Sequence, residues 1–553
     1  MASPVTITFL GGLGEIGRNC ACFELDGRIV LLDCGLMFPD VEMLGIDLVL
    51  PDFTYLRENA DRVEGCIVTH GHEDHAGGLS YLLRDLSFPI YGSELTLGLA
   101  RNRIEEAGLL DRTEFIAVHD GERRRVGPFD CEFIPVTHSV PHGFSVAFHT
   151  PQGVILHSGD FKLDLTPVDG RVTDLARMGS IADQHGVRLL LADSTNAEEI
   201  GHSATESSVG EVLRDLFLAA EGQRIITACF ASHIHRVQQI AAAAVATGRT
   251  VATLGMSMKK NIALAMEMGV LDIPRDRIVD ISEIDDLASE EVCVISTGSQ
   301  GEPMSALALM ASGENKWLKV GPGDTVILSS HPIPGNEANV AKVIDGLYRL
   351  GADVIHSGLA RVHVTGHAMQ EELKTLLSIA RPQWFVPVHG EYRHMIHHGR
   401  LAVAMGVPED QVVLCEDGDQ LTLDDDGLRP SGTVPAGFLY VDGLVGDVGH
   451  GVLRDRRALA EEGLIVVVLT VDVTTGKLIA GPEIITRGWV YAPEAEELLE
   501  DAREAVRAGI EEAPPGARTD VETLKRHARQ ALGRFVSERT RRRPMIVPVI
   551  MEA

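Results

Sequence analysis

The chain of 553 residues contains little that points to a membrane or to an oxidising compartment. It holds no apolar run of about 18 residues, the length that a transmembrane helix requires. Residues 1–9 lack a basic segment followed by an apolar one, so no secretory signal peptide is indicated. The eight cysteines are scattered, with no Cys-x-x-Cys pair. This pattern favours free buried thiols in a reducing compartment, so we expect a cytoplasmic protein with no membrane partner.

Positive charge is scarce as well, since 49 Lys and Arg residues face 80 Asp and Glu residues, for a formal net charge of −31. At face value this balance argues against a nucleic-acid partner, because phosphate binding usually relies on Lys and Arg. Local charge can outweigh the total, however, and bound metal ions are often the largest local charges in a site. Basic residues also gather between Lys525 and Arg543, although such runs are usually solvated helix faces or subunit contacts.

Length and pattern predict several domains. A chain of 553 residues, 45% of them hydrophobic, is expected to form two or three. Strands dominate residues 5–70, and strand and helix then alternate to about residue 200. Short apolar strands alternate with helical stretches in the following segment, which predicts a parallel sheet with crossover helices. The expected division is a first domain at 1–205 and 351–435, an inserted domain at 206–350, a linker at 436–450 and a small α/β domain at 451–553.

The most informative motif is His70-Gly71-His72-Glu73-Asp74-His75, which follows the apolar run 65–69. Imidazole and carboxylate together suit zinc, manganese or a similar divalent ion. One tetrahedral ion cannot easily use four groups from so short a stretch. The spacing therefore predicts two adjacent ions, with His70 and His72 facing one, and Asp74 and His75 facing the other. A solvated loop is the alternative, and it would suit an isolated His-x-His pair better than the complete motif.

Three other strand-like apolar runs each end in a potential ligand, namely His138, Asp160 and His389. In each case turn residues lie beside the ligand, as expected where a strand stops. His142 and His157 are alternative ligands close by. We favour His138 over His142 because His138 directly terminates its strand. We favour Asp160 over His157 because a carboxylate can bridge two cations.

The N-terminal glycines need a separate interpretation. The segment from Gly12 to Gly17 matches the dinucleotide-binding fingerprint, and Asp33 lies at a suitable distance downstream. That fingerprint requires a helix to begin at the glycines. Residues 20–25 instead have an extended pattern, and Asp26-Gly27 is typical of a hairpin turn. We therefore predict a β-turn beside the metal site, with Asp33 bracing the histidine loop from outside the ligand set; a purely structural strand-end carboxylate is the alternative.

Three loops before predicted helices are candidate phosphate-binding sites. Free backbone N–H groups at helix starts attract anions, and small residues let a ligand approach the backbone, although ordinary capping explains any single loop of this kind. We rank first the loop His363-Val364-Thr365-Gly366-His367. Ser232 and His233 come second, and residues 297–299 come third.

Taken together, four motifs resemble the ribonuclease J family, which are β-CASP nucleases of the metallo-β-lactamase fold. They are residues 11–19 (GGLGEIGRN), the HGHEDH motif, residues 192–196 (ADSTN) and residues 363–367 (HVTGH). The resemblance covers nearly the whole chain. It implies an αββα metallo-β-lactamase sandwich, an inserted β-CASP domain with a parallel sheet, and a small C-terminal α/β domain. It also implies the ligand sets: His70, His72 and His138 for one metal, Asp74, His75 and His389 for the other, and Asp160 between them.

The resemblance also implies the chemistry. Two divalent ions, first of all zinc, with manganese or magnesium as alternatives, would activate a shared water, and Asp74 would both ligate and steer it. His367, oriented by Asp193, is the candidate general acid for the departing 3′ oxygen; alternatively it only contacts a substrate phosphate. The products would carry 5′-phosphate and 3′-hydroxyl ends.

We therefore expect a ribonuclease acting on single-stranded RNA, with endonuclease and 5′-to-3′ exonuclease modes in RNA maturation and decay. RNA is favoured over DNA because DNA-directed relatives typically lack a histidine at the position matching His389. A homo-oligomer, dimer or tetramer, and an RNA degradation assembly are the expected partners. The alternatives are a non-catalytic subunit of such an assembly, and a small-molecule metallohydrolase, which predicts an open pocket in place of a roofing domain.

Overall fold

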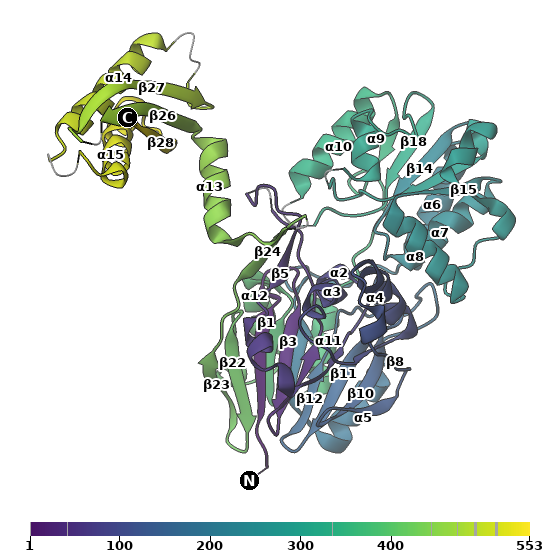
Figure 1. Cartoon of the computed structure of the whole chain (residues 1–553). Coiled ribbons are helices and arrows are strands. Elements are labelled where there is room, and N and C mark those ends of the chain that lie inside the picture. The colour runs from purple at the N-terminus through teal and green to yellow at the C-terminus, as the bar shows by residue number, and fades with distance from the viewer. Residues whose placement is uncertain are drawn as a thin grey trace. The chain divides into compact units, whose positions relative to one another are not determined.

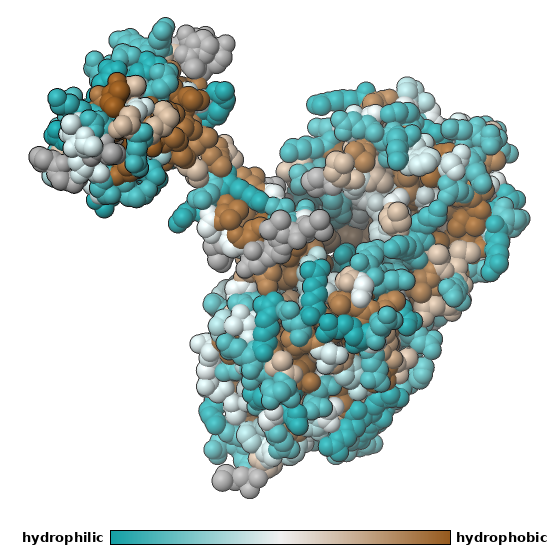
Figure 2. All heavy atoms as spheres, in the orientation of Figure 1, coloured by the Kyte–Doolittle hydropathy of each residue, from teal (hydrophilic) through white to brown (hydrophobic). Residues whose placement is uncertain are grey.

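The computed structural model describes residues 2–40, 42–302, 304–333, 336–443, 445–472, 474–490, 495–514 and 518–553. The chain forms two units (Figure 1). The first comprises residues 1–40 and 48–439, and the second comprises residues 41–47 and 440–553. Among the described residues, no helix is long and apolar enough to span a membrane. Hydrophilic residues cover much of the visible face of each unit (Figure 2).

The first unit contains two mixed sheets. The larger one has eight strands in the order β23-β22-β1-β3-β4-β6-β7-β8. Its strands are β1 (Val5–Gly11), β3 (Cys20–Leu25), β4 (Arg28–Leu32), β6 (Val63–Ile67), β7 (Ile90–Gly92), β8 (Phe115–Ala117), β22 (Asp419–Asp424) and β23 (Gly427–Thr433). The strands from β4 to β8 are parallel, and those from β23 to β4 are antiparallel. The short strand β5 (Leu48–Pro51) lies outside this sheet.

The second sheet has six strands in the order β20-β13-β12-β11-β10-β9. They are β9 (Arg123–Val126), β10 (Phe129–Val136), β11 (Gly143–Thr150), β12 (Gly153–His157), β13 (Val187–Asp193) and β20 (Trp384–Val388). Neighbours β12, β13 and β20 run parallel, so their carboxyl ends meet at one edge of the sheet. Asp160 and His389 follow two of these ends, and Asp193 is the last residue of the third.

The two sheets pack face to face. Their inner faces supply one apolar cluster, in which the rings of Phe23 and Phe148 stack at 4.4 Å and Phe129 meets both edge-on. A second apolar cluster joins the outer face of the six-stranded sheet to helices α5 (Leu175–His185), α11 (Gln370–Ala380) and α12 (Tyr392–Ala404). Helix α4 (Glu94–Glu106) contacts β7 and β8 of the larger sheet. The layering is helix, sheet, sheet, helix, which confirms the expected αββα sandwich.

A third sheet separates β13 from β20 in the sequence. Its six strands are all parallel, in the order β16-β15-β17-β14-β18-β19. They are β14 (Arg224–Ala228), β15 (Thr250–Leu254), β16 (Ile278–Val279), β17 (Val292–Ser296), β18 (Asp324–Leu328) and β19 (Asp353–Ile355). Its helices are α6 (Ser207–Ala219), α7 (Ile234–Ala246), α8 (Met256–Glu267), α9 (Ala306–Ala311) and α10 (Glu337–Arg349). The expected parallel sheet with crossover helices is confirmed; the two short edge strands, β16 and β19, were not anticipated.

The second unit is small. Its sheet has the order β27-β26-β28, with strands β26 (Leu464–Asp472), β27 (Lys477–Arg487) and β28 (Met545–Glu552). Alternate residues of β26 are buried against helices α14 (Glu496–Glu511) and α15 (Val521–Thr540). The expected α/β class of this segment is confirmed. The range 436–450, expected as a linker, holds strands β24 (Phe438–Asp442) and β25 (Val445–Asp447) and the start of helix α13 (Gly449–Glu461).

Candidate metal centre

The HGHEDH motif turns sharply after β6. His72 is the N-cap of the single-turn helix α2 (Glu73–Ala76), so the chain reverses between His70 and Asp74. The loop lies close to the segment after β4: a Cβ at Gly35 would lie 1.7 Å from the carbonyl oxygen of Asp74. Only glycine permits this approach, which brings the acidic end of the motif against the end of β4.

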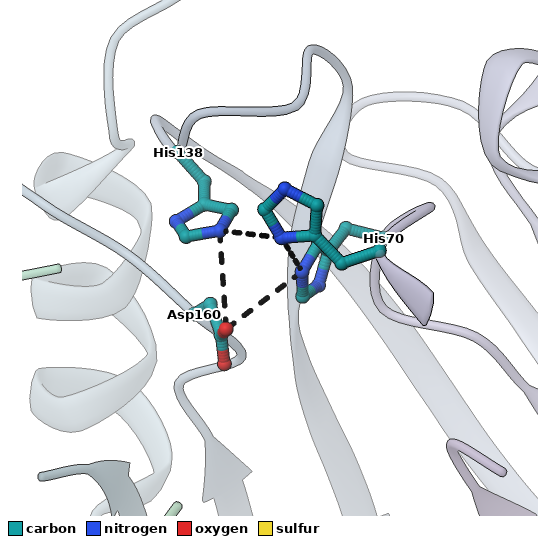
Figure 3. Close-up of side chains that lie close together, drawn as sticks. His70, His138 and Asp160 are labelled. Carbon is teal, nitrogen blue, oxygen red and sulfur yellow. Dashed lines mark hydrogen bonds and ion pairs between the residues drawn. The ribbon is translucent and has the colours of Figure 1, made fainter. Parts of the chain in front are cut away.

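Four residues of the first group have ligand atoms within 4.8 Å of one another: His70, His72, His138 and Asp160. Nδ1 of His72 lies 3.0 Å from Nε2 of His70 and 3.1 Å from Nε2 of His138. The Asp160 carboxylate lies 3.7 Å from His70 and 3.9 Å from His138. Figure 3 shows His70 and His138 both turned toward Asp160. Three imidazoles and a carboxylate around one point form a donor set that suits a divalent cation.

The second group consists of Asp74, His75, Asp160 and His389. Oδ2 of Asp160 lies 3.2 Å from Nε2 of His75 and 3.3 Å from Nε2 of His389. The Asp74 carboxylate lies 3.5 Å from His75 and 3.9 Å from His389. Asp160 therefore belongs to both groups, as a carboxylate between two cations must.

In the first ligand group the protonation fits metal ligation, which requires neutral imidazole and ionised carboxylate, whereas in the second group Asp160 outweighs burial and raises the pKa of His75 and His389. Burial lowers the pKa of His70 and His72 well below the usual value, and lowers that of His138 to about 3. Burial alone would raise the pKa of Asp160, but His389, His75 and His70 hold it well below the usual range. Burial alone would lower the pKa of His75, but Asp160 and Asp74 outweigh it and raise that pKa. A cation in the site would compete with the proton for the ring nitrogen.

The Nδ1 atoms of four imidazoles are held by other groups. Asp33 lies 2.8 Å from Nδ1 of His75, and the Gly366 carbonyl lies 2.8 Å from that of His138. Thr69 lies 3.1 Å from Nδ1 of His70, and Asn19 lies 3.0 Å from that of His389. Such contacts fix the ring orientation and turn each Nε2 toward the other members of the ligand groups. Asp33 is predicted from the sequence to brace the histidine loop, whereas the contact of Asn19 is not, although Asn19 ends one of the family motifs.

The backbone is strained at two of these positions. Asp33 has a φ of 61° and His389 has a φ of 51°, the left-handed region that non-glycine residues rarely adopt. Each directly follows a strand, β4 and β20 respectively, so the strain turns its side chain at the strand end. Strained residues of this kind concentrate at functional sites.

His367 and Asp193 form a pair beside the two groups. Nδ1 of His367 lies 2.7 Å from Oδ2 of Asp193, and 4.0 Å from Asp160. Burial opposes the charged form of His367, but Asp193 and then Asp160 raise its pKa to about 9. This raised pKa favours the protonated form of His367 at neutral pH. The side chain is 20% exposed, so a substrate can reach it.

The expected phosphate loops lie at the carboxyl end of the parallel sheet. His233 caps α7 through Nδ1, and its buried Nε2 has no hydrogen-bond partner. Nδ1 of His363 is likewise buried without a partner. Thr365 accepts a hydrogen bond from Asn196, whereas the Val364 side chain belongs to the apolar core and leaves only its backbone to face a ligand.

The third predicted loop, residues 297–299, directly follows β17 and so lies at the same end of the parallel sheet. His142 and His157 belong to neither four-residue group among the described residues. His157 instead accepts a hydrogen bond from the backbone N–H of Gly159. At the glycine motif the chain continues into strand β3 and not a helix, which agrees with the predicted turn.

Family models match most of the chain. Residues 13–213 match the metallo-beta-lactamase superfamily, and residues 222–347 match the ribonuclease J beta-CASP domain. Residues 353–412 match a Zn-dependent metallo-hydrolase RNA specificity domain, and residues 451–553 match the ribonuclease J C-terminal domain.

Curated relatives extend over the full length. The chain is 41% identical to ribonuclease J 1 of Streptococcus pyogenes over 550 residues, covering 99% of this chain and 98% of the relative. It is 42% identical to ribonuclease J of Mycobacterium tuberculosis over 548 residues, covering 99% and 97%. A crystal structure of a protein of unknown function from Enterococcus faecalis shares the fold, with a TM-score of 0.55, 15% identity, and coverage of 76% of this chain and 100% of that one. The chain therefore belongs to the ribonuclease J family.

Proposed function

We propose that the chain is a metal-dependent ribonuclease that hydrolyses single-stranded RNA to 5′-phosphate and 3′-hydroxyl ends. The observation that carries this proposal is the pair of four-residue groups that share Asp160, with His367 and Asp193 beside them. Zinc is the proposed metal, because histidine and carboxylate donors dominate both groups, with manganese or magnesium as alternatives. The relatives named as ribonucleases and the match to an RNA specificity domain support RNA as the substrate.

The proposed mechanism assigns one role to each residue. When bound, two divalent cations lower the pKa of a shared water and offset phosphate charge. Asp74 is 28% exposed, whereas Asp160 is buried, so Asp74 is the carboxylate that can orient the attacking water. His367 donates its proton to the departing 3′ oxygen, and Asp193 holds the ring and stabilises its charged form. If His367 instead contacts only a substrate phosphate, its removal will weaken binding more than turnover.

We further propose that His233, His363 and Ser232 receive the 5′-phosphate in the exonuclease mode. Two buried imidazole nitrogens without partners require a polar ligand or water, because a buried unpaired polar group is unfavourable. Arg236 is fully buried and its guanidinium pairs with Glu206, so it adds no free charge. Such a pocket offers little to offset the extra charge of a triphosphate, which favours monophosphorylated ends. Endonuclease cleavage, the second proposed mode, does not require a 5′-monophosphate on the RNA.

The wider proposals are a cytoplasmic location, a homo-oligomer, and participation in an RNA degradation assembly. Eight free, buried cysteines support a reducing compartment. The proposed domain boundaries remain 1–205 and 351–435 for the metallo-β-lactamase domain, 206–350 for the β-CASP domain, 436–450 for the linker and 451–553 for the C-terminal domain. The alternative is a non-catalytic subunit, which would have no need of two intact ligand groups. Measuring turnover together with metal content distinguishes this alternative from the ribonuclease.

The test uses purified protein with 5′-monophosphorylated and 5′-triphosphorylated single-stranded RNA, in zinc, manganese or magnesium. We expect faster exonucleolytic decay of the monophosphorylated RNA and internal cleavage that is nearly indifferent to the 5′ end. Asn315→Ala is the control, because Asn315 is a buried amide outside the ligand groups: its Nδ2 donates to the Ala306 carbonyl, and its Oδ1 accepts from the backbone N–H groups of Trp317 and Leu318. Absence of turnover with every metal would overturn the proposed function.

A further inference from the structure

Asn19 lies among residues that three distant parts of the chain bring together. Its Nδ2 lies 3.1 Å from the carbonyl oxygen of Asp74 and 3.1 Å from Nε2 of His75. Its Oδ1 lies 3.0 Å from Nδ1 of His389. Its backbone N–H donates to the same Asp74 carbonyl at 3.0 Å. Asn19 thus contacts Asp74, His75 and His389, which together with Asp160 form the second ligand group.

The contacts settle which way the amide points. A carbonyl oxygen can only accept a hydrogen bond, so the atom facing Asp74 is Nδ2, and the atom facing His389 is Oδ1. Because Oδ1 only accepts, His389 must carry its proton on Nδ1. With the proton on Nδ1, a neutral His389 ring has its lone pair on Nε2 for a cation, and this Nε2 lies 3.3 Å from Asp160.

The glycine motif is shaped to deliver this side chain. Gly12 has a φ of 94°, and a Cβ there would lie 2.3 Å from Oδ1 of Asn19. Gly17 has a φ of 130°, and a Cβ there would lie 2.8 Å from Met37. The turn therefore requires glycine for its backbone at both positions, and at Gly12 also to leave room for the amide.

The neighbouring residue anchors the turn. Arg18 is 1% exposed and has a φ of 53°. Its guanidinium pairs with Glu15 at 2.7 Å and with Asp417 at 2.9 Å, and it stacks over the Phe438 ring at 4.2 Å. These contacts anchor the turn through residues outside the ligand groups, so the Asn19 side chain is presented by a fixed backbone.

We propose that Asn19 is a positioning residue for one of the two metal ions: it fixes the tautomer and orientation of His389 and ties that ring to the Asp74–His75 turn. The proposal rests on the proposed two-metal function. Asn19 has no recorded contact with His70, His72 or His138 in the described structure, where Nδ1 of His70 and His138 is held by Thr69 and Gly366. Its effect should therefore be confined to the ion of the second group.

The test measures metal binding and not RNA cleavage. Metal-free protein is titrated with Zn²⁺ against a chromophoric chelator to obtain both affinities. We expect Asn19→Ala to weaken one ion by about 10–100-fold, the usual effect of removing such a contact, and to leave the other within about twofold. Asn19→Asp keeps the acceptor for His389 but loses the donor to the Asp74 carbonyl, so it should recover affinity in part, whereas Asn19→Leu keeps volume without polarity and should not. Asn315→Ala controls for the loss of a buried amide.

Each outcome decides between explanations. Unchanged affinities in Asn19→Ala, or equal weakening of both ions, would overturn the positioning role. If Asn19→Ala does not fold, the zinc affinities of Asn19→Asp and Asn19→Leu are compared instead. Equal affinities in these two variants would overturn the positioning role. If the wild-type protein itself binds no zinc, the two-metal function fails and the role of Asn19 fails with it, a result distinct from equal affinities in the wild type and Asn19→Ala. Nitrogen-15 histidine spectra of the metal-free protein add a second readout, because the Nδ1–H signal of His389 should be lost in Asn19→Ala.

Discussion

The pair formed by His367 and Asp193 makes the sharpest prediction about catalysis. Asp193 is the strongest of the groups that raise the pKa of His367, which reaches about 9 from an ordinary value of 6.5. A difference of about 2.5 pKa units corresponds to roughly 3 kcal/mol of interaction favouring the charged ring. Asp193→Asn removes the carboxylate charge and leaves a group of the same shape, so it should lower this pKa by about 1–2 units.

The sign of the pH effect follows from the proposed role. A general acid works only when protonated, so activity falls as pH rises through its pKa. Lowering that pKa moves the alkaline limb of kcat/KM to lower pH. Bound cations also lower the pKa of His367, but they do so in both proteins, so the shift between the proteins remains. The assay is the pH profile of kcat/KM on one RNA at fixed metal concentration, with metal content measured at each pH.

His367→Ala supplies the companion measurement. It should slow cleavage by about 10²–10⁴-fold, the usual contribution of a general acid, abolish the alkaline limb assigned to His367, and retain both metals. An alkaline limb that stays in place in Asp193→Asn would refute the reasoning, and so would loss of a metal ion from His367→Ala. A raised KM with unchanged kcat in His367→Ala would assign the ring to phosphate binding instead.

The other predictions concern ligands, end recognition and the core. His72→Ala should abolish hydrolysis and leave the fold intact, and full activity in the metal-replete variant would contradict the two-metal site. Ser232→Ala combined with His233→Ala should erase the preference for 5′-monophosphorylated RNA and spare internal cleavage, as compared on the two RNAs. Phe148→Ala should lower the free energy of unfolding by about 3–5 kcal/mol, because it empties the stacked core between the two sheets; a change below about 1 kcal/mol in denaturant titration would contradict that packing.

The local pattern of apolar residues was sufficient to predict which segments form strands or helices, and which strand ends carry potential metal ligands. His138, Asp160 and His389 each follow an apolar run that the structure forms as a strand, namely β10, β12 and β20. The alternation that predicted the parallel sheet is also local, because each strand and helix is long enough to show its own period. Strands β16 and β19 have two and three residues, too few to show one.

The sequence by itself therefore determined the fold class, the potential ligands and the family motifs. Only the tertiary structure decided which strand ends meet. Asp160 lies beside His389 because β12, β13 and β20 are parallel neighbours, and it meets His70 and His75 because the two sheets pack face to face, an arrangement that no local period encodes. Asn19 reaches His389 across 370 residues of sequence, through a turn held by Arg18. Such contacts depend on the packing of whole sheets, so the groups that hold the imidazoles become visible only when the chain is folded.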